Sequence, residues 1–168
     1  MRWLYFISIY LHILSALIWL GGMLFLVLIV APMLRQPDYK EAAGRILEEA
    51  GERFRTWGWI ALTTFFVTGL YNAAYRLGGF SVLFRAESWN GIWLKTLGVK
   101  LALFGVIVIL SAVHDFKIGP EATRMMEKAP DDPATLRLRK MAAWIGRINL
   151  LLALVIVYIA ISLVRGMP

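Results

Sequence analysis

The sequence predicts an all-α integral membrane protein, a four-transmembrane-helix bundle with short amphipathic helices at the membrane interface. Two observations carry this prediction. Sixty per cent of the 168 residues are apolar and the mean hydropathy is +0.67, well above the usual mix of a soluble domain. Four apolar segments are each long enough to span a bilayer, at roughly residues 3–32, 57–77, 92–114 and 141–165. Long apolar segments indicate helices, because a helix satisfies its own backbone groups in lipid.

The first two spans are separated by a charged stretch. Residues 3–32 run apolar for too long to be a signal peptide, so we expect a retained helix. Pro32 is expected to end it, because proline cannot continue a helix. Residues 38–56 mix charges with apolar residues at helical spacing, which predicts an amphipathic interfacial helix leading into the span 57–77.

Turn residues mark the remaining boundaries. The loop 78–91 carries aromatic residues typical of an interfacial cap. After the third span, Gly119-Pro120 predicts a turn followed by a short helix over 120–129. Asp132 with Pro133 is a good N-cap and first-turn pair, so we expect the last helix to begin near residue 133. No internal repeat is evident in the sequence.

Lysine and arginine predict the orientation of the bundle. Twelve of these cations lie on the side of the long loops 33–56 and 115–140, against five on the side of the two termini. Because cytoplasmic loops carry an excess of Lys and Arg, we expect both loops in the cytoplasm and both termini outside, in a bacterial inner membrane. The net charge of +7 is therefore assigned to membrane orientation, and not to nucleic-acid binding.

Two ionisable residues lie inside predicted spans, His12 in the first and Lys100 in the third. Such residues are rare in a bilayer and usually mark function. If the two spans centre near residues 17 and 103, then at 1.5 Å per residue His12 lies about 7 Å and Lys100 about 5 Å from the centre, both toward the outer side. The second histidine, His114, lies near the opposite membrane face, about 24 Å from His12 along the membrane normal. One haem iron is therefore not expected to bind both histidines.

Further candidates share the faces of these two residues. Ser15 and Trp19 follow the histidine at helical spacing, and Trp93 shares the face of the lysine. Small Ser15 beside bulky Trp19 leaves room for a flat cofactor, although small residues in spans are more often helix-packing positions. Lys95 either extends to the membrane surface or holds a cofactor propionate. A stripe of hydroxyl side chains on the second span is typical of interhelical contacts and comprises Thr64, Thr68, Tyr71 and Tyr75.

Histidine is the commonest protein ligand for haem iron, so His12 is a candidate haem or metal ligand, the alternative being a hydrogen-bonded packing residue. Lys100 is the opposite iron ligand or a partner of a propionate, since no Asp or Glu lies inside a predicted span. His114, beside Asp115, is either a helix-end histidine or the ligand of a second site. The absence of cysteine excludes disulfides, iron–sulfur clusters and covalently attached haem.

The chain resembles the CopD-like bacterial membrane family. The segments that carry this resemblance are His12–Pro32, Arg53–Tyr71, Trp93–Leu110 and His114–Pro120. The chain is also similar to the HemJ-type four-helix protoporphyrinogen oxidases, whose first-span histidine and tryptophan and third-span lysine fall on His12, Trp19 and Lys100. The first resemblance implies copper handling, and the second implies a b-type haem held by the histidine and the lysine. Leu24–Val27 departs from the Tyr-Leu-Pro-Arg stretch that continues the first span in HemJ-type chains.

These observations together predict a membrane-bound b-type haem protein that performs electron transfer or redox chemistry. Haem b would lie between spans 1 and 3, with quinol or a redox protein as partner and a homo-oligomer as an option. The first alternative is a CopD-like copper transport or tolerance protein, placed second because the seven methionines form no dense cluster with histidine. A HemJ-like protoporphyrinogen oxidase and a cofactor-free membrane interaction subunit are the others.

Overall fold

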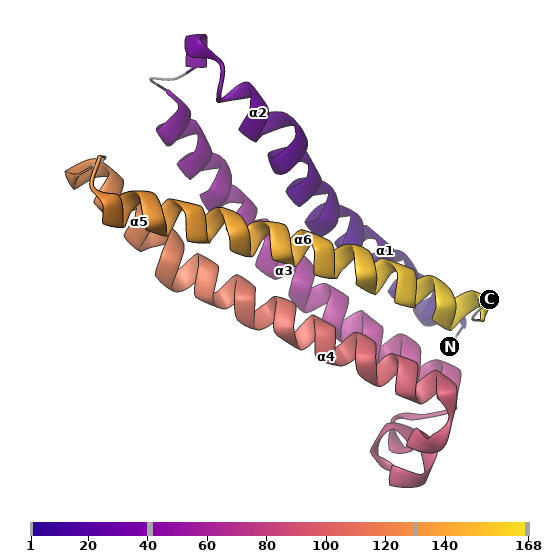
Figure 1. Ribbon diagram of the computed structural model, residues 1–168. Helices are drawn as coiled ribbons and strands as arrows, with labels where there is room; N and C mark the ends of the chain where they lie inside the picture. The colour runs from indigo at the N-terminus through magenta and orange to yellow at the C-terminus, as the bar shows by residue number, and fades with distance from the viewer. Residues whose placement is uncertain (1, 40–41, 130, 167–168) are drawn as a thin grey trace. The chain divides into compact units, whose positions relative to one another are not determined.

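The computed structural model describes residues 2–39, 42–129 and 131–166, and every regular element within them is helical. The chain forms two compact units that divide between Asn90 and Gly91 (Figure 1). The first unit contains α1 (Arg2–Phe25), the π-helical turn η1 (Leu26–Val30), α2 (Ala31–Met33), η2 (Pro37–Tyr39), α3 (Ala43–Leu77), η3 (Phe80–Phe84) and η4 (Ala86–Asn90). The second contains α4 (Ile92–Val113), the π-helical turn η5 (His114–Ile118), α5 (Gly119–Lys128) and α6 (Pro133–Arg165).

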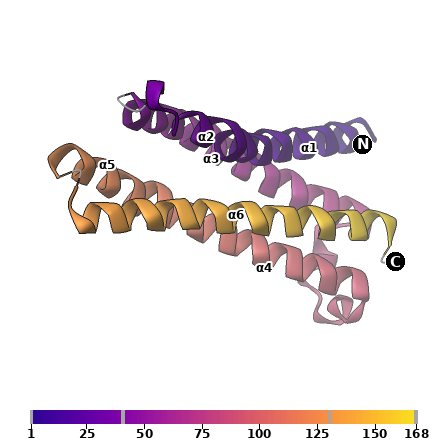
Figure 2. The ribbon, with the colours of Figure 1, turned by 45° about the horizontal axis from the view of Figure 1, so that its top comes forward.

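Each unit is an antiparallel pair of long helices, which we call the first and second hairpins. In the first hairpin α1 lies along α3, as Figure 2 shows. Tyr5 near the start of α1 stacks on Tyr75 near the end of α3, with ring centroids 4.0 Å apart. Three residues further along α1, the Ser8 hydroxyl donates to the backbone carbonyl of Thr68 at 3.4 Å. The order of these contacts fixes the antiparallel direction.

The second hairpin pairs α4 with α6 in the same way (Figure 2). The indole nitrogen of Trp93, near the start of α4, donates to the carbonyl of Leu163 near the end of α6 at 3.1 Å. Toward the other end of α4, Asn149 Nδ2 donates to Ser111 Oγ at 3.0 Å. Both members of this polar pair are buried, so the hydrogen bond links the two helices inside the hairpin.

The first helix ends one residue after Pro32, so its predicted end is confirmed to within one residue. The helix passes through the π turn η1 and continues to Met33. The backbone N–H of Ala31 bonds to the carbonyl of Leu26, five residues back, as in a π-helix. Because proline brings no N–H and its ring crowds the preceding turn, a locally wider turn lets the helix run on past it. The turn η5 precedes Pro120 in the same manner.

The predicted interfacial helix over 38–56 is not a separate element. Within the described residues, the stretch from Ala43 onward is the start of α3, which continues without a break to Leu77. Lys40 of the predicted segment lies outside the described residues. Helix α5 covers most of the predicted 120–129, but the turn predicted at Gly119-Pro120 is wrong, because the helix runs without a break from α4 through η5 into α5. The predicted start of the last helix agrees with the structure: α6 begins at Pro133, with the Asp132 side chain accepting from the backbone N–H of Ala134 at 2.7 Å.

Three stretches of the described residues are long and apolar enough to cross a membrane: Arg2–Met33, Ile92–Met126 and Pro133–Arg165. The predicted span 57–77, within α3, is not among them, because Trp, Thr, Tyr and Asn residues dilute its hydropathy. The four-span count and the interfacial position of the short helices therefore stay predictions. The all-helical class and the membrane-spanning character are confirmed.

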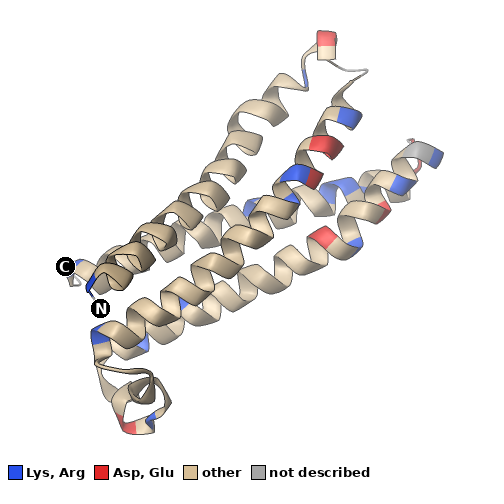
Figure 3. Cartoon of the chain, turned by 180° about the vertical axis from the view of Figure 1, so that it is seen from behind, with Lys and Arg blue, Asp and Glu red and all other residues tan. Residues whose placement is uncertain are grey.

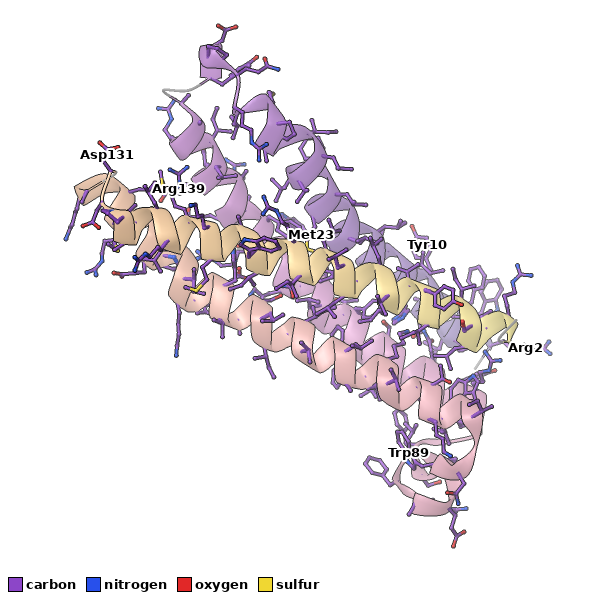
Figure 4. All side chains as sticks on the ribbon, viewed as in Figure 1. Arg2, Tyr10, Met23, Trp89, Asp131 and Arg139 are labelled. Atoms are coloured by element: carbon purple, nitrogen blue, oxygen red, sulfur yellow. The ribbon has the colours of Figure 1, made fainter. Side chains whose placement is uncertain are left out.

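The distribution of side chains suits a bilayer. Charged residues gather toward the turn of each hairpin and in the loop after α3, whereas the central stretches carry few charges, among them Lys100 of α4 (Figure 3). On α1 the exposed residues are large and apolar, including Leu4, Ile7 and Leu17, whereas Ser8 and Ser15 are buried. Small and polar residues inside with apolar residues outside is the pattern of helices that pack in lipid. Trp89, labelled in Figure 4, donates to the carbonyl of Leu83 within the predicted aromatic loop.

Candidate functional site

His12 lies against α3 inside the first hairpin. Its Nδ1 is 3.0 Å from the backbone carbonyl oxygen of Phe65 and 3.0 Å from Thr68 Oγ1. The imidazole also stacks on the Phe65 ring, with centroids 4.0 Å apart and planes inclined by 18°. We call Phe65, Thr68 and Gly69 the His12 cradle, because one turn of α3 supplies all three.

The cradle selects one tautomer of the neutral histidine. Thr68 has a single hydroxyl proton, and the 2.6 Å contact to the carbonyl of Thr64 takes it. Thr68 Oγ1 can therefore only accept at Nδ1, and the Phe65 carbonyl is also an acceptor. Both contacts require the proton on Nδ1, which leaves the ring lone pair on Nε2. A backbone carbonyl or hydroxyl that holds one ring nitrogen is the arrangement that commonly orients a metal-binding histidine.

Gly69 completes the cradle by having no side chain. A Cβ at this position would lie 3.0 Å from Cε1 and 3.5 Å from Nδ1 of His12. The first distance is tighter than ordinary van der Waals contact, so any larger residue would press on the imidazole ring. The glycine therefore permits the close approach of the ring to α3.

Two other sequence candidates, Ser15 and Trp19, also lie in the first hairpin. Trp19 lies over Gly58 of α3, where an added Cβ would be 3.6 Å from its Cδ1. Ser15 is buried and donates to the carbonyl of Leu11 in its own helix at 2.7 Å. The Phe54 ring fills the space beside Gly22. These contacts agree with the helix-packing alternative for small residues in a span, and the predicted place of Ser15 beside a cofactor stays a prediction.

Lys100, Lys95 and Trp93 belong to the second hairpin and are placed by α4. Lys100 is partly buried and Lys95 is exposed. The Trp93 indole is engaged with Leu163 on α6, so it contributes to helix pairing. The predicted use of these residues with His12 in one cofactor site stays a prediction.

His114 opens the π turn η5, and its Nδ1 lies 2.8 Å from Asp115 Oδ1. The helix continues past His114 through η5 into α5, so the interpretation of His114 as a helix-end histidine is wrong. The alternative role, as ligand of a second site, stays a prediction. Among the residues that the structure describes, no three His, Cys, Asp or Glu side chains gather where they could hold a metal ion.

The sequence does not reveal the residues that hold His12 in place. Thr68 was visible as part of a hydroxyl stripe typical of interhelical contacts, and that interpretation is confirmed by its bond with His12. Phe65 contributes through its backbone carbonyl and Gly69 through the absence of a side chain. Neither contribution has a residue signature that a single sequence could reveal.

The fold and the site define a multi-pass membrane protein built from helix hairpins, with one histidine oriented by hydrogen bonds inside the first. The family model of copper resistance protein D (CopD) matches residues 48–163. This match covers more than half of the chain, so the chain belongs to the CopD family.

Two relatives agree with this assignment in extent or in name. An uncharacterized protein of Aquifex aeolicus (strain VF5) is 34% identical over 159 residues, which cover 94% of each chain. The copper transport protein CutJ of Bacillus subtilis (strain 168) is 32% identical over 105 residues, or 62% of this chain. The match covers only 18% of CutJ, so the chain corresponds to a small part of that protein. No solved structure matches the chain.

Proposed function

We propose that this protein carries copper ions across a bacterial inner membrane and that the ion contacts His12 on its way. The family and the printed name of one relative point to copper. They favour the copper alternative of the sequence analysis over the b-type haem protein. The observation that carries the proposal is the orientation of His12, whose Nδ1 is held by Phe65 and Thr68.

The chemistry of the site supports this choice of substrate. Imidazole nitrogen is a good ligand for copper, and a neutral ring can bind the ion without first losing a proton. The Nδ1 hydrogen bonds fix the tautomer of the neutral ring, with the lone pair on Nε2, and hydrogen bonds of this kind also raise ligand basicity. An ionisable residue inside an apolar helix is in itself a marker of an ion pathway.

We further propose that α3 is a fourth span and that both termini lie outside. Although the hydropathy of α3 is modest, the helix lies along α1 and buries Ala61, Leu62 and Thr68. A polar helix of this kind is tolerated in a bilayer when a neighbouring helix covers its polar groups. The excess of Lys and Arg near the turns of both hairpins supports a cytoplasmic position for these turns.

Copper binding by the purified protein tests the proposal, with the two histidines as a matched pair. We expect wild type to bind Cu(I), His12→Ala to weaken binding at least about tenfold, and His114→Ala to leave it unchanged. When the same proteins are expressed in a copper-sensitive strain, His12→Ala should alter cellular copper content relative to wild type, and His114→Ala should not. Equal binding by wild type and His12→Ala would refute the assignment of His12.

An absorption spectrum of the same preparation, oxidised and then reduced with dithionite, separates copper from the b-type haem predicted from the sequence. Haem would use the same histidine, since an axial ligand also needs a ring lone pair. We expect no Soret band after expression with added haem. A Soret band that His12→Ala abolishes would overturn the copper proposal in favour of haem b.

A further inference from the structure

The π turns and the ends of the long helices correspond residue by residue between the two hairpins, and the starts of the long helices correspond to within two residues. The π turns begin at Leu26 and His114, which are 88 residues apart, and each has 5 residues. With the same shift of 88, the end of α1 at Phe25 corresponds to the end of α4 at Val113. The end of α3 at Leu77 corresponds to the end of α6 at Arg165. No insertion or deletion is needed anywhere between these points.

The residues that shape the boundaries also correspond. Pro32 and Pro120, which follow the π turns, are 88 residues apart. So are Gly78 and Gly166, the glycines that follow α3 and α6, whose φ angles are 85° and 86°. A positive φ favours glycine, so the same residue type meets the same backbone requirement in both hairpins.

Contacts and burial follow the shift as well. Tyr5 stacks on Tyr75 in the first hairpin, and their counterparts Trp93 and Leu163 share a hydrogen bond in the second. Several positions are buried in both hairpins, with little identity of side chain: Met23 and Ser111, Val30 and Ile118, Leu34 and Ala122, Ala61 and Asn149, and Thr68 and Ile156. The correspondence therefore extends from the backbone to the packing between the helices.

We propose that the second hairpin is a repeat of the first and holds, at Lys100, a latent copy of the His12 copper site. The shift of 88 that aligns the π turns and the ends of the long helices places Lys100 on His12. The inference rests on the proposed copper function of His12. It adds that the cargo site belongs to the hairpin as a unit and that one of the two copies has lost it.

The counterparts of the cradle explain the loss. Ala153 stands for Phe65 and keeps the backbone carbonyl that a ring Nδ1 would need. Ile156 stands for Thr68 and removes the hydroxyl acceptor. Val157 stands for Gly69, where even a Cβ would lie 3.0 Å from the imidazole. A branched side chain here excludes a ring, whereas the slender stem of a lysine fits.

Restoring the cradle in the full-length protein tests the proposal. We expect Lys100→His with Ile156→Thr and Val157→Gly to raise Cu(I) bound per chain from one to two. Lys100→His alone should stay at one, because Val157 crowds the ring and Ile156 offers no acceptor. Adding His12→Ala to the triple variant should return it to one copper. A triple variant that binds no more Cu(I) than wild type, while wild type loses binding on His12→Ala, overturns the repeat site.

Failure of the proposed copper function gives a different pattern, in which wild-type binding is absent or insensitive to His12→Ala. In that case the tautomer of the histidine introduced at position 100 still tests whether the two sites are equivalent. Nitrogen NMR of the triple variant should report the introduced imidazole protonated at Nδ1, as His12 is, and a different tautomer refutes the equivalence.

Cysteine crosslinking checks the register without copper, since the chain has no cysteine of its own. The contact of Ser8 with Thr68 predicts that Ser8→Cys and Thr68→Cys are joined by a short bifunctional thiol reagent. By the shift of 88, Thr96→Cys and Ile156→Cys should be joined equally well, as read by mass spectrometry. Thr96→Cys with Tyr158→Cys is the control, because two further residues turn the second cysteine to another face of α6. Failure of the 96–156 pair with success of the 8–68 pair contradicts the repeat.

Discussion

At the scale of single residues, His12 shows what a sequence reveals and what it hides. An ionisable residue in an apolar segment is visible at once, because it is expensive there. Its partners are not visible, since Phe65 acts through its backbone carbonyl and Gly69 through the space it leaves. The pairing of residue 12 with residues 65–69 depends on how α1 and α3 pack, which no local pattern encodes.

Gly69→Ala should impair copper binding without unfolding the hairpin. The new Cβ would lie 3.0 Å from Cε1 of His12 and displace the imidazole from its hydrogen bonds. Disturbing such a supporting contact typically costs about tenfold or more in metal affinity. Titration of purified protein with Cu(I) measures the effect.

Gly51→Ala, on the same helix, is the matched control. A Cβ at Gly51 would meet nothing within 4 Å, so copper affinity should be unchanged. Thermal stability should rise by up to about 1 kcal/mol, because alanine favours a helix over glycine. Equal copper affinity in the Gly69→Ala and Gly51→Ala proteins would show that the cradle does not orient His12.

At the scale of elements, local signals succeeded where the chemistry is local. Asp132 and Pro133 gave the start of α6, because an N-cap needs only the next few residues. The prediction of a separate helix over 38–56 was wrong. The charged residues in Ala43–Arg55 resemble an interfacial helix, although nothing interrupts the backbone of α3. Charge predicts which part of a helix meets water, but it does not predict where the helix ends.

Removal of the α6 cap should destabilise the second hairpin. Asp132→Ala takes away the acceptor that lies 2.7 Å from the Ala134 N–H, and loss of such a cap typically costs about 1 kcal/mol. Asp131→Ala changes charge equally and leaves the cap in place. Thermal unfolding in detergent should therefore show a lower midpoint for Asp132→Ala than for Asp131→Ala, and identical midpoints would contradict the role of the cap.

At the scale of the whole molecule, composition was sufficient to predict the class of the protein but not its internal repeat. Apolar length predicted the membrane helices, and three of them meet a strict hydropathy criterion among the described residues. The repeat escaped notice because the paired positions carry different side chains, such as Met23 against Ser111 and Ala61 against Asn149. The π turns and the φ angles of Gly78 and Gly166 survive such changes, and these backbone features are visible only in the structure.

Accessibility of single cysteines tests whether α3 crosses the membrane. Asp38→Cys precedes α3 and Ser81→Cys follows it, and both positions are exposed. If α3 is a span, an impermeant thiol reagent added to intact cells with an opened outer membrane should label Ser81→Cys and not Asp38→Cys. Labelling both positions from the same side would mean that α3 does not cross the bilayer.

The proline that follows each π turn also favours one depth of its hairpin in the membrane. Pro32 brings no N–H, so the helix there has one donor fewer than it has carbonyls, and an unpaired carbonyl costs several kcal/mol in hydrocarbon. Water or lipid headgroups can supply the missing donor, which favours a position of this turn at the membrane boundary. In an α-helix the N–H missing at Pro32 would bond to the carbonyl of Leu28, four residues before it, and His12 lies 16 residues before Leu28. At 1.5 Å per residue this is about 24 Å of a core about 30 Å thick, so an ion entering from the opposite boundary would reach the imidazole after roughly 6 Å of hydrocarbon.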